Sequence, residues 1–323
     1  MPFFNRAPQW LGLALLSATL TAPMAAMAQT YPSKPIRIVV PFPAGGTQDV
    51  LMRMVAEPLA KRLNQPVIVD NRGGAAGNLG ADVVAKAPAD GYTLGLLSGV
   101  HTANSAFYRK IAFNLEKDFV PVKALGESAV VFVSGNKAPF ATVPEFLSYV
   151  KAHPGKVQVG STTSFAVDLL KMQTGADMQF IPYKGVGEAL QDLIGERLDV
   201  VVGPGLQLIP LVKDGKIRAF GLGSSRRVPE LPKATPFKES QPDYDVGMWF
   251  ALFAPKGTPA DVVTKLQKEV NEVLHQPGME QKLAQQGIDM GFSSASAADI
   301  QTRVHTEIQR WKAVVAKTGN YAN

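Results

Sequence analysis

The feature that most constrains the fold is the segment IRIVVPFPAGGTQD at residues 36–49. It opens with a mostly β-branched run, which is typical of a buried parallel strand. Pro41 and Pro43 then end the strand, because proline cannot donate to a strand ladder. The glycines at 45 and 46 allow a tight turn with uncovered backbone amides, and apolar residues at four-residue spacing predict a helix directly afterwards.

A strand, a glycine turn and a helix start in succession can form an anion site, because unpaired N–H groups and the helix dipole converge there. Asp49 falls in the first helical turn, where we expect it to order the loop rather than contact a ligand. The glycines fit neither the P-loop nor the GxGxxG pattern, so nucleotide binding is disfavoured and no cofactor is expected. Taken alone, the segment favours a strand-to-helix connection that binds nothing.

The rest of the chain alternates short apolar strands with helices, which predicts an α/β fold with a parallel sheet. Further strands are expected at residues 67–69, 92–97, 119–133, 157–159, 200–202, 217–222 and 249–253. Helices are expected at 79–86, 142–152, from about 165, at 186–194 and at 206–213, with two more that begin after the N-caps Thr258 and Ser296. Residues 228–242 are rich in proline and lack periodicity, which indicates a surface loop.

Two further loops follow strands and carry polar groups. Ser98–His101 lies just past the third strand, and the hydroxyl-rich segment Gly160–Ser164 lies past a later one. Ligands of open α/β sheets bind outside the carboxyl ends of strands, so we expect Ser98–His101 to lie beside Gly45 and Gly46.

Residues 1–28 have the pattern of a secretory signal peptide. Arg6 supplies the basic region, Trp10 to Leu20 the apolar region, and Ala26-Met27-Ala28 the cleavage site, with cleavage expected after Ala28. No later stretch has some 18 uninterrupted apolar residues, so we expect a mature protein without a membrane span. The chain has no cysteine, which excludes disulfides, thiolate metal sites and cysteine nucleophiles.

Charge and histidine spacing argue against nucleic-acid binding and catalysis. The net charge is +6 with 19% charged residues, and the basic residues are dispersed, so no nucleic acid is expected as a partner. The histidines stand at 101, 153, 275 and 305 without metal-ligand spacing, and there is no GxSxG nucleophile elbow. We therefore expect no catalytic residue, no metal and no enzyme. Only His101 lies in a predicted ligand loop, where a hydrogen-bonding or structural role is expected.

The chain closely resembles the periplasmic solute receptors of tripartite tricarboxylate transporters, the Bordetella uptake gene (Bug) family. Any single matching segment is weak, but the set spans nearly the whole mature chain in the family's order. The segments are YPSKPIRIVVPFPAGGTQD (31–49), NQPVIVDNRGGAAGNLGADVVAKAPADGYTL (64–94), KDFVPV (117–122), IPYKGVGEALQDLIGERLDV (181–200), LFAPKGTPADVV (252–263) and EIQRWKAVVAKTG (307–319).

This resemblance implies a type II periplasmic binding protein, in which two α/β lobes are joined by two crossing strands with a ligand cleft between them. Lobe 1 would comprise residues 29–127 and 250–323, and lobe 2 residues 128–249, with crossings near 125–133 and 246–254. Such receptors bind small carboxylic acids, here a di- or tricarboxylate or an aromatic carboxylate. They deliver the acid to the large and small membrane subunits of a transporter, and we expect a periplasmic monomer.

The resemblance also implies a ligand site. The loop after the first strand would hold a ligand carboxylate through backbone groups, with hydroxyls from Thr47 and Thr162 and an apolar wall from Phe42. The residues expected at the site are Phe42, Ala44, Gly45, Gly46, Thr47, Asp49, Ser98, Gly99, His101, Gly160, Ser161, Thr162, Thr163, Tyr183, Gly203 and Pro204.

Two departures from the family and three rival functions stay open. The loop at 160–164 is shorter than in relatives, and Gly203-Pro204-Gly205 stands where many relatives carry an Asp, which favours a ligand without a cationic amine. The rivals are a receptor that presents its ligand to a sensor kinase, a periplasmic enzyme on the same fold, and a structural envelope protein. An enzyme would need a general base, and among the cleft residues His101 alone is placed to serve.

Overall fold

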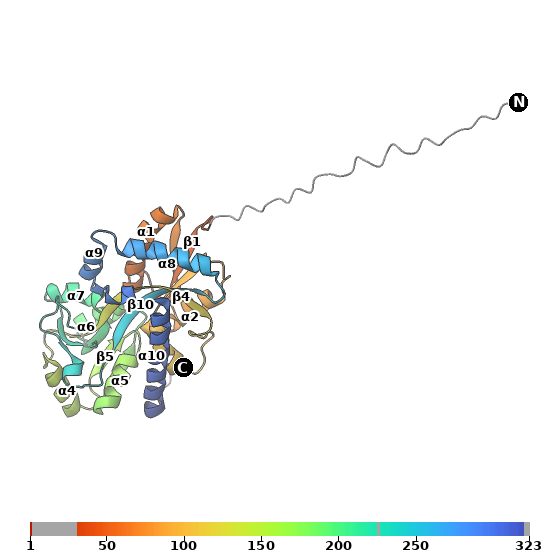
Figure 1. Ribbon diagram of the computed structural model, residues 1–323. Helices are drawn as coiled ribbons and strands as arrows, with labels where there is room; N and C mark the ends of the chain where they lie inside the picture. The colour runs from red at the N-terminus through yellow and green to blue at the C-terminus, as the bar shows by residue number, and fades with distance from the viewer. Residues whose placement is uncertain (2–30, 225–226, 320–323) are drawn as a thin grey trace. The chain divides into compact units, whose positions relative to one another are not determined.

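The computed structural model describes Met1, residues 31–224 and residues 227–319 (Figure 1). The predicted signal peptide and its cleavage site lie outside the described residues, apart from Met1. Residues 32–323 form one unit, to which the description below refers. Within the described residues, no helix combines the length and apolar character needed to cross a bilayer.

The strands form one mixed sheet in the order β2-β1-β3-β10-β4-β7-β5-β6, with β11 and β8 also paired to β4, and β9 to β8. The strands are β1 (Ile36–Val40), β2 (Val67–Asn71), β3 (Thr93–Ser98), β4 (Phe119–Ser134), β5 (Gln158–Ser161), β6 (Gln179–Pro182), β7 (Val200–Pro204), β8 (Arg218–Leu222), β9 (Thr235–Pro236), β10 (Gly247–Pro255) and β11 (Ile288–Asp289).

Helices alternate with these strands, as the sequence pattern predicts. They are α1 (Thr47–Leu63), α2 (Asn78–Ala85), α3 (Gly99–Phe107), α4 (Val143–Ala152), α5 (Phe165–Thr174), α6 (Val186–Ile194), α7 (Gly205–Lys213), α8 (Ala260–Leu274), α9 (Met279–Gln285) and α10 (Ala297–Thr318). The described residues also form three short 3₁₀ helices: η1 (Ala75–Gly77), η2 (Phe237–Glu239) and η3 (Gly291–Ser294).

Two groups of strands share β4. In the first group β2, β1 and β3 run parallel, and β10 runs antiparallel between β3 and β4. In the second group β6, β5 and β7 run parallel, with β7 antiparallel to β4. In Figure 1, α1 and α8 lie toward one end of this unit, and α4, α5, α6 and α7 lie toward the other. β4 and β10 lie between these two sets of helices.

β4 passes from one group to the other in its middle. Residues up to Ala129 pair with β10, whereas Val130–Ser134 pair with β7. Gly126 lies just before this change, with φ of +153°, and a Cβ there would lie 2.7 Å from the carbonyl oxygen of Asp289. Glycine is therefore required at this point. β4 and β10 occupy the segments expected for the two crossing strands, and the lobe boundaries stay a prediction.

Each strand group has its own apolar core, which stabilises it by burial. One cluster joins β3 and β10 to α10 and includes the fully buried Trp249 and Phe253. The other joins β4, β7 and β8 to α6 and α7 and includes Val201 and Leu208. An additional set of aromatic rings surrounds Phe132, whose centroid lies 4.5 Å from that of Phe237.

The prediction of a loop at Ser98–His101 is wrong. Ser98 ends β3 and is the N-cap of α3, so that Gly99 and His101 belong to the first helical turn. α3 is buried on nearly all sides, with eight of its nine residues buried. It therefore lacks the amphipathic periodicity that identifies a surface helix in a sequence.

Smaller differences concern element ends. Gly160 and Ser161 belong to β5 rather than to a loop, and Pro259 rather than Thr258 is the N-cap of α8. The expected loop at 228–242 contains β9 and η2, and α9, β11 and η3 intervene between the last two predicted helices. These insertions are each seven residues or shorter, too short for a periodic pattern to reveal.

Candidate functional site

A cavity of about 370 Å³ lies where several strands end and helices begin. Both strand groups contribute to its walls, and the first group does so in part through β10. The lining residues are Phe42, Pro43, Ala44, Gly45, Gly46, Thr47, Gln48, Val100, Thr162, Lys184, Gly185, Val186, Gly187, Glu188, Pro204, Gln207, Met248 and Phe250. A concave site at the carboxyl ends of strands is the expected place for a ligand in an α/β protein.

Three helices, α1, α6 and α7, begin at this cavity, and a fourth, α3, contributes a residue of its first turn. Gly46 is the N-cap of α1, Gly185 that of α6 and Pro204 that of α7, and Val100 lies in the first turn of α3. Gly46, Gly185 and Pro204 have no side-chain group that could cap a helix. The N-cap of α3, Ser98, does have one. The first amides of a helix have no intrahelical partner and carry partial positive charge. The cavity is therefore suited to anionic groups.

The loop after β1 is held in place by Asp49. The Gly45 amide donates to Asp49 Oδ2 over 2.9 Å, and Arg53 Nη2 lies 2.9 Å from Asp49 Oδ1. Burial alone would raise the pKa of Asp49, but the hydrogen bonds from Arg53 and Gly45 hold it below its usual value. Gly45 has φ of +78°, a conformation that favours glycine. Asp49 thus orders the loop, as expected, and remains charged.

A second set of hydrogen bonds joins the start of α1 to the start of α3. Gln48 Nε2 donates to Ser98 Oγ over 3.1 Å, and the Ser98 amide donates to His101 Nδ1 over 3.1 Å. Burial lowers the pKa of the fully buried His101 to about 4, although backbone contacts with Ser98 and Gly77 oppose this. Because Nδ1 accepts a hydrogen bond, His101 is neutral and has a structural role.

The walls around the cavity are mainly apolar. The apolar lining side chains include Phe42, Val100, Val186, Met248 and Phe250. Among the described lining residues, Lys184 is the single cation and Glu188 the single anion. Both side chains are exposed, and neither has a hydrogen-bond or ion-pair partner within the described part of the chain.

One contact crosses the cavity between the two strand groups. Gln207 Nε2, in the first turn of α7, donates to the carbonyl oxygen of Gly45 over 3.4 Å. The loop after β1 therefore lies within hydrogen-bonding distance of α7.

The structure brings together seven of the residues that the sequence predicted for the site. They line the cavity and are Phe42, Ala44, Gly45, Gly46, Thr47, Thr162 and Pro204. Nine others do not line it, namely Asp49, Ser98, Gly99, His101, Gly160, Ser161, Thr163, Tyr183 and Gly203. Whether any of these residues contacts a ligand stays a prediction.

Several of the nine are engaged elsewhere. The Tyr183 hydroxyl donates to Asp192 Oδ2 over 2.6 Å, and burial together with this carboxylate raises the pKa of Tyr183 to about 12. A Cβ at Gly203 would lie 2.9 Å from Val186 Cγ2. Gly160 lies under Leu198, to which a Cβ would come within 2.5 Å. These positions support the cavity wall from behind.

Sequence reasoning missed the lining residues from α6, α7 and β10. The segment Pro182–Val186 has the same strand, turn and helix order as the loop after β1, which could have identified Lys184 and Gly185. The expectation that no acidic side chain would lie near Gly203 is wrong, because Glu188 lines the same cavity as Pro204, the residue after Gly203. Met248 and Phe250 carried no such signal, because strand pairing alone places them there.

No group of acidic or histidine side chains among the described residues is arranged to hold a metal ion. The one histidine that sequence reasoning placed near the cleft, His101, does not line the cavity. It is buried, so it is not positioned to exchange protons with a ligand.

Comparison with known proteins gives consistent results. Residues 51–320 match the family described as "Tripartite tricarboxylate transporter family receptor". The chain is 35% identical over 323 residues to Protein BugT of Bordetella pertussis, which covers 96% of both chains.

Two solved structures from Rhodopseudomonas palustris are also similar. Rpa4515 with adipate has a TM-score of 0.83 at 31% identity, covering 90% of this chain and 98% of that one. MatC with bound malate has a TM-score of 0.82 at 33% identity, covering 88% and 100%. The prediction of a mixed α/β periplasmic binding protein fold is thereby confirmed.

Proposed function

The chain belongs to the tripartite tricarboxylate transporter receptor family, a family of binding proteins rather than enzymes, and from this premise we propose that it binds a small dicarboxylate. The observation that carries the proposal is the convergence of three helix N-termini and the first turn of α3 on one cavity. α1 and α3 reach it from the first strand group, and α6 and α7 from the second. A ligand with an anionic group at each end meets partial positive charge at both walls.

One carboxylate would lie at the start of α1. There the Thr47 amide is an unpaired helix donor, whereas the Gly46 amide donates to the carbonyl oxygen of Pro43 over 3.2 Å. The hydrogen bonds that a carboxylate accepts from amides are strong in a desolvated site. The Thr47 hydroxyl is buried and has no hydrogen-bond partner among the described residues, which leaves it available to a ligand.

The second carboxylate would face Lys184. This side chain is the single cation among the described lining residues, and it precedes the N-terminus of α6. Apolar side chains line the space between the two ends, which suits a short carbon chain. The adipate and malate of the two similar structures are both dicarboxylates, which supports this choice over an aromatic monocarboxylate.

The wider role follows the family. We propose that the protein matures by cleavage after Ala28, acts in the periplasm as a monomer, and delivers its ligand to the large and small membrane subunits of a tripartite transporter. Hinge motion between the strand groups would close the cavity.

Calorimetric titration with a matched acid series tests the proposal. We expect adipate to bind and hexanoate, which has the same number of carbon atoms but one carboxylate, to bind about tenfold more weakly or worse. Benzoate and glutamate test the aromatic and amino-acid alternatives. Tight binding of glutamate together with no binding of adipate would contradict the proposal, because Glu188 would then serve a ligand amine.

The variant Lys184→Met tests the second carboxylate subsite. Removing the ammonium group should weaken adipate binding about tenfold and leave hexanoate binding within about threefold, because only adipate has a carboxylate to lose a partner. Lys213→Met, at the exposed end of α7, is the matched control and should bind both acids as the wild type does. An unchanged preference for adipate in Lys184→Met would remove Lys184 from the site and leave the dicarboxylate proposal standing.

A further inference from the structure

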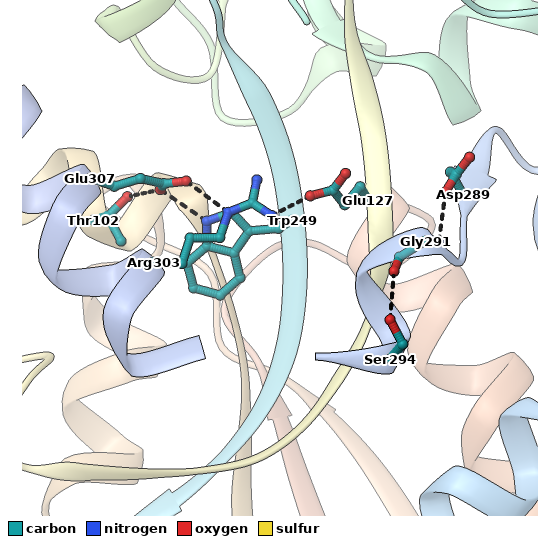
Figure 2. A network of polar contacts seen from close by, with 8 residues as sticks. All are labelled: Thr102, Glu127, Trp249, Asp289, Gly291, Ser294, Arg303 and Glu307. Carbon is teal, nitrogen blue, oxygen red and sulfur yellow. Dashed lines mark hydrogen bonds and ion pairs between the residues drawn. The ribbon is translucent and has the colours of Figure 1, made fainter. Parts of the chain in front are cut away.

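A polar network lies behind the cavity, on the reverse face of β10. Met248 and Phe250 line the cavity, and Trp249 between them points the other way, because side chains alternate along a strand. Figure 2 shows Trp249 directed from β10 toward Glu307 of α10. The network therefore contacts the cavity wall without reaching the cavity.

Glu307 lies at the centre of this network. Its Oε2 atom accepts a hydrogen bond from Trp249 Nε1 over 2.9 Å and one from Thr102 Oγ1 of α3 over 2.8 Å. Its Oε1 atom accepts one from Arg303 Nε over 3.0 Å. One carboxylate thus connects α10 to both α3 and β10 (Figure 2).

Arg303 extends the network to β4. Its guanidinium forms an ion pair with Glu127 and lies 4.4 Å from the ring centroid of Phe292. Glu127 pairs with Trp249 of β10, a short distance before Val130, where β4 begins to pair with β7. The network therefore holds both crossing strands at the point where the two strand groups meet.

These charges are largely withdrawn from water. The exposed fractions of the side chains are 28% for Arg303, 25% for Glu127 and 19% for Glu307. Removing Glu307 takes the acceptor away from Trp249 Nε1 and leaves Arg303 with Glu127 as its one carboxylate in the network, which is costly because these groups are partly buried. The remaining groups would then be expected to move toward water and to release the elements that they connect.

The same elements form the cavity wall. α3 supplies Val100, and β10 supplies Met248 and Phe250, whereas no member of the network lines the cavity. We propose that Glu307 is a positioning residue that fixes α3 and β10 relative to each other and so sets ligand affinity without touching the ligand. The proposal rests on the proposed function only in its choice of adipate as the probe.

The test compares Glu307→Ala with Glu307→Gln in the mature protein. The amide oxygen of glutamine can still accept from Trp249 and Thr102, so Glu307→Gln should keep adipate affinity within about threefold, whereas Glu307→Ala should lose about tenfold or more. Glu272→Ala on α8 removes an exposed partner of Arg62 and is the matched control, with wild-type affinity expected.

A second readout needs no ligand. Amide hydrogen exchange of the free protein should become about fivefold faster or more at residues 98–104 and 247–252 in Glu307→Ala and stay unchanged along α8. Wild-type affinity and wild-type exchange in Glu307→Ala would overturn the proposal, as would uniformly faster exchange with unchanged affinity. If the wild type itself fails to bind adipate, the dicarboxylate proposal fails, and the exchange experiment still decides the role of Glu307.

Discussion

Replacing Gly46 with tryptophan is expected to weaken adipate binding by about 100-fold or more and to leave the protein folded. Gly46 lines the cavity and has φ of −74°, which any residue can adopt. A Cβ there would lie 3.1 Å from the carbonyl oxygen of Pro43, so the loop needs only a small adjustment. The indole would then occupy much of a cavity of about 370 Å³. Calorimetric titration measures the loss, and the midpoint of thermal unfolding checks the fold.

Gly135→Trp is the matched control. Gly135 lines a different cavity, beside Leu193 and Lys216, and its nearest contact would be the Leu193 carbonyl oxygen at 3.9 Å. This variant should bind adipate as the wild type does. If Gly46→Trp kept wild-type affinity, the loop after β1 would not be the carboxylate site.

The second large effect concerns acid. Between pH 6.5 and pH 4, His101 is expected to reduce the free energy of unfolding by about 3 kcal/mol. Burial lowers the pKa of His101 in the folded protein to about 4, against an ordinary value of 6.5. As the pH falls through this range, the unfolded chain takes up a proton that the folded protein does not, so the unfolded state is favoured. Below pH 4 both states are protonated and the loss stops growing.

His101→Asn isolates this contribution. The Asn side-chain oxygen can still accept from the Ser98 amide but cannot take up a proton in this range. Urea unfolding at several pH values should therefore give a stability loss that is about 3 kcal/mol smaller in the variant than in the wild type. His275→Asn, at the exposed end of α8, controls for the substitution itself. Parallel pH profiles for His101→Asn and the wild type would contradict the assignment of a buried neutral imidazole.

The local part of the fold could be predicted from the sequence. β1 and α1 emerge from a β-branched run, two prolines, two glycines and four-residue apolar spacing, all within residues 36–63. The capping pattern at Ser296 correctly marked the start of α10. In contrast, α3 was missed because its burial on nearly all sides removes the pattern that distinguishes a helix from a loop.

The candidate site was predictable only in part, for a related reason. The loop after β1 carries its own signal, and Phe42, Gly45 and Gly46 were identified from it. Lys184, Glu188 and Phe250 reach the cavity through the pairing of strands that are distant in the chain, which no local pattern encodes. Reasoning from single segments therefore described one wall of the cavity and left the opposite wall incomplete.

The acidic side chain of Glu188 alters the expected ligand preference. The glycine at 203 suggested that a ligand amine would find no acidic partner, but Glu188 lines the same cavity. In the proposed site, selection for a dicarboxylate would therefore depend on Lys184 and on the helix N-termini rather than on the absence of negative charge. The comparison of adipate with glutamate decides between these two side chains.

The central claim is that a small dicarboxylate binds between the two strand groups, with one carboxylate on the amides at the start of α1. A crystal structure of the adipate complex tests it most directly. We predict a carboxylate oxygen within about 3 Å of the Thr47 amide nitrogen, with the other carboxylate on the side of Lys184. Adipate bound outside this cavity, or inside it with neither carboxylate at the start of α1, would contradict the account.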